Sequence, residues 1–404
     1  MDIKLIYFNE QTKVNICHFH NKESYLINYS IKKIVLIIAL FFLSILIKYY
    51  VLKLKEKLNV YSIGKKFIDK CIKTKNLYNY SIFYDSPKFS IVIPTYNCEK
   101  TINYPIISIQ NQNISEYEIL LINDFSTDQT LKILHSFSER DSRIKIINNR
   151  ENKGTLYSRC IGTLMSKGKY IFPLDNDDLI FGEDIFDYFY KINKNIECDI
   201  VGFKAVQAES YLDDICEMKD LRNYKYKNNL TVLQPELSIW LISKYNKFEP
   251  HDVTIWGKII KTNIYINAIN LLGKKRYSTY MSWAEDTSMN HVIFNIANSF
   301  KFIDKYGIFH LNNNTTASYT QSINNHFFGE LFLTDIIYDF SKQNHNKIFS
   351  LLSALETLKR YYNKRAFIKK ESIQYLNNII LKILKCKYIN DKDKNKLINL
   401  YHKF

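Results

Sequence analysis

Three carboxylates stand in four consecutive positions, Asp175-Asn-Asp-Asp178, directly after the apolar run Tyr170 to Leu174. Carboxylates this close repel one another unless a cation lies between them. Hard oxygen ligands favour Mg²⁺ or Mn²⁺, ions that keep waters and share their coordination shell with phosphate. The alternative is an acidic loop that only caps the following helix. The position of the motif in the fold decides between these two interpretations.

The chain around this motif alternates between strand and helix patterns over residues 88–180. Apolar, β-branched runs occupy 89–94, 118–124, 144–147 and 170–174, and helical segments between them end near Asn111, Phe137 and Ser166. Strands that alternate with helices predict an α/β fold with a mostly parallel sheet and helices on both faces. Ligands bind at the carboxyl ends of the strands in such sheets.

Polar residues follow the apolar runs and are expected to share one rim of this sheet. Thr95 and Tyr96 follow the first run, Asp124 ends the second, and the acidic motif follows the fourth. This common placement favours a metal and phosphate site over a simple helix cap. The chain has no GxGxxG or GxxxxGK[ST] segment, so the usual signatures of dinucleotide binding and P-loop hydrolysis are absent.

Several ordered segments resemble family 2 glycosyltransferases, which have the GT-A fold. SIVIPTYNCEKTI, EILLINDFSTDQT and NRENKGTLYSRCIGTLMSKGKYIFPLDNDD resemble the nucleotide-sugar half of that family. Further on, HDVTIWGKIIKTNIY is similar to its Trp-x-Lys segment, MSWAEDTSMNHVIF to its Glu-Asp motif, and YGIFHLNNNTTAS to the segment that closes the domain. The resemblance covers about residues 88–320.

The resemblance implies a binding site for a nucleotide-diphosphate sugar, UDP being the favoured nucleotide, with Mn²⁺ or Mg²⁺ as the cofactor. The metal would neutralise charge on the departing diphosphate. The residues implied to bind the nucleotide sugar are Thr95, Tyr96, Asp124, Arg159 and Asp175, with Thr95, Asp124 and Arg159 near the base. The implied metal ligands are Asp177, Asp175 and His310, although His310 could instead contact the diphosphate or be a structural histidine.

The same resemblance implies a reaction in one displacement step, which inverts the configuration of the anomeric carbon. Asp286 corresponds to the family's general base, which deprotonates the acceptor hydroxyl. Glu285 is expected to orient Asp286 or to bind the acceptor, and Trp256 to form a wall of the acceptor site. The chain departs from the family pattern at Asn123, Phe125 and Cys160, and these departures concern nucleotide contacts rather than the catalytic set.

We therefore expect an enzyme that moves a hexose to a hydroxyl of a glycan, lipid or polymer. One alternative is a catalytically silent nucleotide-sugar-binding scaffold of the same fold, which the presence of Asp175, Asp177 and Asp286 disfavours. Another is a basic protein that binds nucleic acid. The acceptor and the donor sugar are not specified by any motif.

A membrane anchor is expected before this domain. Residues 34–52 form an apolar stretch with Lys48 as its one charge, and 19 residues of helix extend about 28 Å, close to the thickness of a bilayer core. The alternative is a buried core helix. Basic residues are more numerous after the stretch than before it, which favours a cytoplasmic catalytic domain over a luminal one.

The remaining divisions follow from composition. We expect an N-terminal tail (1–33), a basic linker (53–87), the GT-A domain (88–325) and a basic, helical C-terminal appendix (326–404). The 404-residue chain has a net charge of +16. Residues 88–325 hold 27 basic and 27 acidic residues, whereas 1–87 hold 14 and 6, and 326–404 hold 15 and 7. The excess therefore indicates an anionic membrane surface as partner, not nucleic acid.

Overall fold

The computed structural model describes the central part of the chain almost continuously and its two ends in part. The described residues are 35–36, 38–53, 55, 66, 86–194, 197–208, 219–220, 231–233, 254–281, 283–311, 323–341 and, with gaps, 358–403. The chain divides into two compact units, Met1–Ser62 and Ile63–Phe404. Most of the predicted N-terminal tail and basic linker lies outside the described residues.

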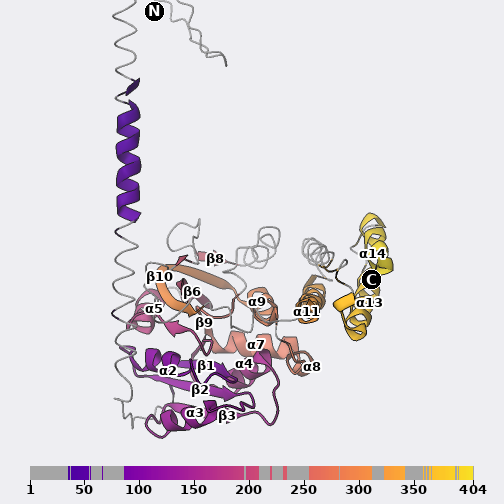
Figure 1. The fold of residues 1–404 in the computed structure, drawn as a ribbon, viewed down its shortest axis with the longest axis horizontal. Coiled ribbons are helices and arrows are strands. Elements are labelled where there is room, and N and C mark those ends of the chain that lie inside the picture. The colour runs from indigo at the N-terminus through magenta and orange to yellow at the C-terminus, as the bar shows by residue number, and fades with distance from the viewer. Residues whose placement is uncertain are drawn as a thin grey trace, which may run out of the picture. The chain divides into compact units, whose positions relative to one another are not determined.

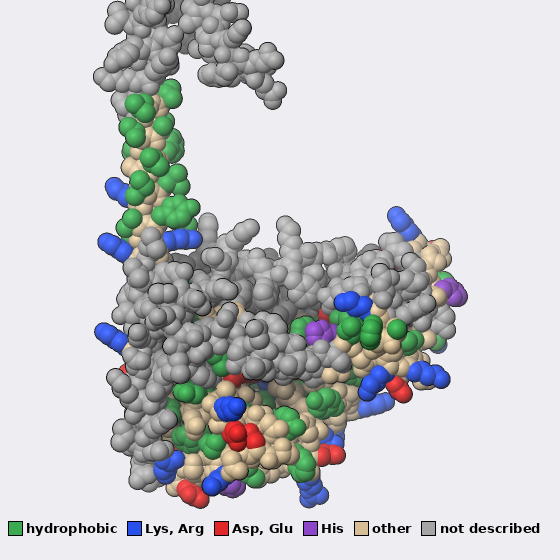
Figure 2. Space-filling view, viewed as in Figure 1, with side chains coloured by type: hydrophobic (Ala, Val, Ile, Leu, Met, Phe, Trp, Pro, Cys, Tyr) green, Lys and Arg blue, Asp and Glu red, His purple; other side chains and the backbone are tan. Residues whose placement is uncertain are grey.

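The first unit contributes one described helical stretch, residues 38–53. Its large hydrophobic side chains are exposed, and Figure 2 shows them distributed around the helix surface. Neither this helix nor any other in the described part of the chain combines the length and the apolarity that a membrane crossing requires. The span expected over residues 34–52 is thus not supported.

A ten-stranded mixed sheet organises the described part of the second unit (Figure 1). Its main path runs in the order β3-β2-β1-β4-β9-β6-β10-β5, and β7 and β8 pair with β6 and β10. The strands are β1 (Phe89–Thr95), β2 (Tyr117–Asn123), β3 (Ile144–Asn148), β4 (Tyr170–Pro173), β5 (Leu179–Ile180), β6 (Ile200–Ala208), β7 (Lys219–Asp220), β8 (Thr231–Leu233), β9 (Lys258–Lys261) and β10 (Ser299–Leu311).

The predicted parallel half of the sheet is confirmed. β1 pairs in parallel with both β2 and β4, and β2 pairs in parallel with β3, so the carboxyl ends of these four strands lie at one rim. The second half is mixed: β9 runs antiparallel to β4 and β6, whereas β6 and β10 are parallel to each other. Each predicted strand boundary lies within one residue of the observed one.

Helices cover both faces of the sheet because side chains alternate along each strand. Ile91 and Ile93 of β1 face the core under α2, α3 and α5, while Val92 faces the core under α4, α7 and α9. The helices are α2 (Asn103–Gln110), α3 (Thr130–Ser138), α4 (Thr155–Leu164), α5 (Ile185–Asn193), α7 (Thr262–Leu272), α8 (Lys274–Tyr277), α9 (Glu285–Ile296), α11 (Ile323–Ser341), α13 (Lys370–Leu384) and α14 (Asp391–Lys403).

Gly162 allows α4 to approach the sheet closely. A Cβ atom at this position would lie 2.5 Å from Val92 Cγ1 and 2.6 Å from Ile122 Cδ1. Real Cβ atoms do not pack that tightly, so any larger residue would push α4 away from β1 and β2. The position of α4 matters because this helix carries Arg159.

The C-terminal helices join the catalytic domain through α11. Phe332 and Ile336 belong to the core shared with α7 and α9, whereas Leu333 and Ile337 belong to a separate core with α13 and α14. The boundary expected at residue 325 falls inside α11. Figure 1 shows α11 between α9 and the pair formed by α13 and α14.

A buried carboxylate, Asp335, connects these helices. It is 4% exposed and accepts hydrogen bonds from Arg276 Nη2 of α8 (2.9 Å), Lys382 Nζ of α13 (2.8 Å) and the Tyr375 hydroxyl (3.1 Å). These donors hold the pKa of Asp335 below its usual range although burial acts in the opposite direction. Asp335 therefore fixes α8 and α13 to α11.

Replacing Asp335 by Ala is expected to destabilise the protein by about 2 kcal/mol, because the variant removes a charged acceptor of three hydrogen bonds while Arg276 keeps its pair with Asp339. Chemical denaturation of the full chain measures this loss. Asp187→Ala is the matched control: it removes an exposed ion pair with Lys191 of the next helical turn and should cost at most about 0.5 kcal/mol. Equal losses in the two variants would contradict this account.

Candidate active site

Two loops after the parallel strands are tied together at the carboxyl rim. Asn97, which follows β1, accepts a hydrogen bond from Thr127 N (2.8 Å) and donates its own N–H to Ser126 Oγ (3.2 Å). Asn97 and Phe125 both adopt positive φ angles, 46° and 64°. Non-glycine residues in this conformation store strain that neighbouring contacts must hold, and such strain clusters at functional sites.

Three of the residues predicted to bind the nucleotide lie at this rim in different settings. Tyr96 is 46% exposed and free of the sheet core. Thr95 is fully buried, and its hydroxyl donates to Ile122 O (3.0 Å), which links β1 to β2. Asp124 is 3% exposed. Of these three, Tyr96 is the side chain presented to a ligand.

Asp124 shapes the turn that precedes α4. Its carboxylate accepts hydrogen bonds from Asn149 Nδ2 (2.7 Å), Lys153 N (2.9 Å) and Gly154 N (2.7 Å). Gly154, with φ at 85°, is the residue from which α4 begins. A carboxylate offers about four acceptor sites, so one remains for a ring N–H of a base. The predicted base contact of Asp124 stays a prediction beside this structural role.

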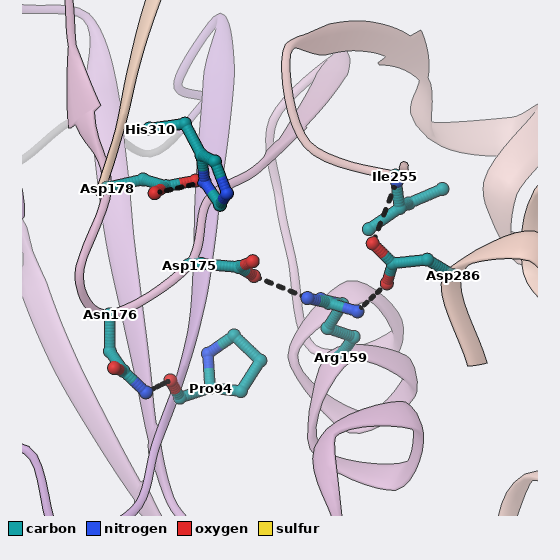
Figure 3. A network of polar contacts seen from close by, with 8 residues as sticks. All are labelled: Pro94, Arg159, Asp175, Asn176, Asp178, Ile255, Asp286 and His310. Atoms are coloured by element: carbon teal, nitrogen blue, oxygen red, sulfur yellow. Dashed lines mark hydrogen bonds and ion pairs between the residues drawn. The ribbon is translucent and has the colours of Figure 1, made fainter. Parts of the chain in front are cut away.

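Arg159 lies between two carboxylates. Its Nη2 pairs with Asp175 and its Nη1 with Asp286, two contacts from opposite directions (Figure 3). Arg159 is 4% exposed. The two acidic partners raise its pKa although burial alone would lower it. The predicted position of Arg159 near the base stays a prediction beside this bridge.

Asp286 occupies the second position of α9 and is held at both of its oxygens. One accepts from Arg159 and the other from Ile255 N (3.1 Å). Burial raises the pKa of Asp286, while Arg159 and the buried Lys258 oppose that rise. The acidic first turn of α9 is also where backbone N–H groups favour negative charge.

Lys258 is a contributor that the sequence analysis left without a role. It is 3% exposed, its Nζ donates to Thr254 O, and it lowers the pKa of Asp286. Thr254 O also accepts from Asn290 Nδ2 of α9 (2.7 Å). The Trp-x-Lys resemblance was the signal that could have assigned this residue to the site.

Glu285 precedes Asp286 in the chain and lies near the carboxylates of Asp286 and Asp175. Its burial and the Asp286 charge raise its pKa to about 7, and Arg159 opposes this rise. The structure thus brings Glu285 and Asp286 together as a coupled pair, as the Ala-Glu-Asp motif predicted. A carboxyl with a pKa near neutrality can hold or release a proton at physiological pH.

The acidic loop after β4 points into the same site. Asn176 Nδ2 donates to Pro94 O (3.0 Å), which joins the loop to the end of β1 (Figure 3). Asp177 has a pKa well above its usual range, first because it is buried and then because Asp178 and Asp175 repel its charge. This buried, mutually repelling set suits a cation, and its oxygen donors are those that Mg²⁺ and Mn²⁺ prefer.

His310 pairs with Asp178, the one carboxylate of the motif that had no assigned role. Its Nδ1 lies 2.9 Å from Asp178 Oδ1, and the same oxygen accepts from Leu311 N (3.2 Å). Burial would lower the His310 pKa, but Asp178 and Asp177 raise it to about 9. Asp178 engages Nδ1 of His310, and the predicted role of His310 as a metal ligand or diphosphate contact stays a prediction.

Trp256 is a packing partner of His310. The two rings stack with centroids 4.8 Å apart and an interplanar angle of 18°. Trp256 is 5% exposed, so it supports His310 from behind. Its predicted place in the acceptor wall stays a prediction. Residues 209–218, 221–230 and 234–253, where acceptor contacts were expected, lie outside the described residues.

The predicted metal ligands are Asp175, Asp177 and His310. Among the described residues, no group of three or more His, Cys, Asp or Glu side chains is arranged to hold a metal ion. Asp178 is engaged by His310, and Asp175 by Arg159. Asp175 and Asp177 have suitable chemistry for Mg²⁺ or Mn²⁺, and phosphate oxygens and water are the ligands such ions add.

The sheet and its covering helices form an α/β fold of the GT-A type. Residues 90–239 match the family model described as glycosyl transferase family 2. The chain therefore carries a family 2 glycosyltransferase domain, as its motifs predicted.

Curated proteins with similar sequences are also named as glycosyltransferases. An uncharacterized glycosyltransferase of Haemophilus influenzae is 32% identical over 213 residues, which are 47% of this chain and 65% of that protein. The Escherichia coli UDP-Glc:alpha-D-GlcNAc-diphosphoundecaprenol beta-1,3-glucosyltransferase WfgD is 28% identical over 186 residues, 45% of this chain and 72% of that one. The chain spans between 40% and 65% of the length of the first three curated relatives.

The fold is also that of a solved enzyme structure. Residues 1–349 of Staphylococcus aureus TarS, in complex with UDP-GlcNAc, superpose with a TM-score of 0.53 at 18% identity. The match covers 76% of this chain and 82% of that one. At this identity the likeness establishes the shared fold.

Glu285→Gln is expected to change how stability depends on pH. A carboxyl whose folded pKa exceeds its unfolded pKa binds more protons when folded, so wild-type stability falls as the pH rises from about 4.5 to 7. The neutral amide should remove this loss and stabilise the protein at pH 8 by on the order of 1 kcal/mol.

Urea unfolding of both proteins at pH 5 and pH 8 measures this difference. The groups that face Glu285 are Asp286, Arg159, Asp175 and Tyr280. The stability difference between the variant and the wild type should shrink toward pH 4.5. A variant that is less stable than the wild type at pH 8 and equal to it at pH 5 would contradict the raised pKa.

Proposed function

We propose that this chain is an inverting, metal-dependent glycosyltransferase that moves a hexose from a nucleotide-diphosphate sugar, UDP-linked by preference, to an acceptor hydroxyl. The observation that carries this proposal is the Asp175–Arg159–Asp286 bridge. It joins the acidic loop on the donor side to the carboxylate at the start of α9. These are the two groups that a single displacement requires on opposite sides of the anomeric carbon.

In this mechanism Asp286 accepts the proton of the acceptor hydroxyl. The acceptor oxygen forms a bond to the anomeric carbon while the bond from that carbon to the diphosphate oxygen breaks, and the electron pair leaves with the diphosphate. Arg159 and Lys258 favour the ionised form of Asp286, which opposes the effect of its burial on the pKa. The protonation state of Glu285 changes the charge near Asp286, and its side chain orients Asp286.

The donor side separates into a base site and a diphosphate site. Tyr96 offers its exposed ring to the base, and Asp124 shapes the adjoining turn. Asp175 and Asp177 would hold Mg²⁺ or Mn²⁺, which supplies positive charge for the departing diphosphate. His310, protonated by its pairing with Asp178, adds a second positive charge on the same side.

The acceptor is proposed to be a glycan or a lipid-linked saccharide at a membrane surface. WfgD is named as acting on a diphosphoundecaprenol-linked sugar, which supports an acceptor of this chemical class. The apolar, exposed helix of residues 38–53 and the charge excess outside the GT-A domain support attachment to an anionic membrane. We propose residues 34–52 as the attached segment, with the catalytic domain in the cytoplasm.

Loss of the base should abolish transfer. Asp286→Asn removes the proton acceptor while preserving size, and kcat should fall by about 10² to 10⁴. Asp177→Ala should cause a loss of similar order because it removes charge compensation from the leaving group. UDP release from UDP-sugars in the presence of Mn²⁺ measures both.

Asp187→Asn is the control for this assay, because Asp187 is an α5 carboxylate that pairs with Lys191 away from the site. It should keep wild-type turnover. Wild-type rates in both Asp286→Asn and Asp177→Ala would show that the assigned mechanism is wrong.

Donor binding can be tested apart from catalysis. A nucleotide sugar at 100 times its Kd should stabilise the protein by about 2.7 kcal/mol and raise its Tm. Asp286→Asn should show the same Tm shift, because Asp286 acts on the acceptor. A panel of UDP-, GDP- and CDP-sugars with Mn²⁺ identifies the donor, and the absence of a shift with all of them would count against nucleotide-sugar binding.

A further inference from the structure

We propose that Trp283, held against α11 by His326 and Gly329, is a positioning residue that fixes the turn from which Asp286 enters the site. The inference rests on the proposed function, since Asp286 is its general base. It assigns a role in catalysis to α11, which lies outside the residues matched by the family model.

Trp283 is held by α11 at both its side chain and its backbone. The Trp283 and His326 rings stack with centroids 4.1 Å apart and an interplanar angle of 8°. A Cβ atom on Gly329 would lie 2.3 Å from Trp283 O and 3.1 Å from its Cδ1. His326 and Gly329 are three residues apart, so they present neighbouring positions on one helix face. Only glycine leaves room for this contact.

The residue after Trp283 has a conformation that needs support. Ala284 adopts φ 61° and ψ 12°, the left-handed region that a residue with a Cβ atom rarely enters. Its carbonyl accepts from Ser288 N (2.9 Å) and so begins α9. Asp286 follows two residues later. The conformation of Ala284 thus sets the direction in which the first turn of α9 and its carboxylates point.

The same segment packs against the nucleotide side of the site. A Cβ atom on Gly154 would lie 3.2 Å from Met281 O and 3.3 Å from the Tyr280 ring. Gly154 N also donates to Asp124 (2.7 Å). The chain before α9 is therefore confined on one side by the start of α4 and on the other by α11. Release of the α11 contact would let Ala284 relax and carry Asp286 away from Arg159.

The opposite face of α11 provides a matched control. Leu331 is fully buried and belongs to the core that α11 forms with α13 and α14. Leu331→Ala should destabilise the protein through a cavity on the helix face that points away from Trp283. It separates a general loss of stability from a loss of position at the site.

The experiment compares the full-length wild type with His326→Ala, His326→Phe, Gly329→Ala and Leu331→Ala. Release of UDP from UDP-glucose and UDP-N-acetylglucosamine with Mn²⁺ gives kcat and KM. We expect kcat to fall at least about tenfold in His326→Ala and Gly329→Ala, because a displaced base is poorly aligned. The Tm shift caused by UDP should be unchanged, and His326→Phe, which keeps a stacked ring, should restore most of kcat.

A second measurement reports position without turnover. Hydrogen exchange of the amides of residues 285–290 should be faster in His326→Ala and Gly329→Ala than in the wild type and Leu331→Ala. Unchanged exchange and unchanged kcat in His326→Ala and Gly329→Ala would overturn the inference, as would equal effects in Leu331→Ala. A wild type that turns over no nucleotide sugar would refute the proposed function, while the exchange data would still decide whether α11 positions the turn.

Discussion

One buried guanidinium holds the site together. Arg159 pairs with two carboxylates that lie 16 and 127 residues away in the chain, and Figure 3 shows it between them. The contacts continue from Asp286 to Ile255, and the next residue, Trp256, stacks on His310. His310 pairs with Asp178 of the acidic loop that also contains Asp175. Through Arg159 and His310, the site thus joins residues that lie far apart in the chain.

Much of this fold could be predicted from local patterns. The β1, β2, β3 and β4 strands are short apolar runs bounded by polar or proline residues, and their order along the chain determines where their carboxyl ends meet. The same reasoning located Tyr96, Asp124 and the acidic motif at one rim. The partner of Arg159 could not be predicted in this way, because the distance between α4 and α9 depends on how β9, α7 and α9 pack after the parallel strands. Asp178 was likewise indistinguishable from its neighbours until β10 placed His310 beside it.

The C-terminal region shows how a helix can belong to two cores. α11 contributes Phe332 and Ile336 to the core shared with α7 and α9, and others of its buried side chains pack with α13 and α14. Within the basic C-terminal region, Lys382 pairs with Asp335, which also accepts from Arg276 of α8. The charge pattern predicted a helical appendix, but it could not show which of its basic residues form ion pairs within the protein.

The Asp335 cluster also determines which part of the protein should loosen first as the pH falls. Its stabilising effect exists only while the carboxylate is ionised, and a lowered pKa means that this effect is lost as the pH falls below the range in which the unfolded carboxyl titrates. The sheet beneath is held by apolar side chains that do not titrate. Acid should therefore loosen the clamp formed by α8, α11 and α13 while the strands remain paired. The parallel strands and their carboxyl rim would then persist after the helices packed beside α9 had separated.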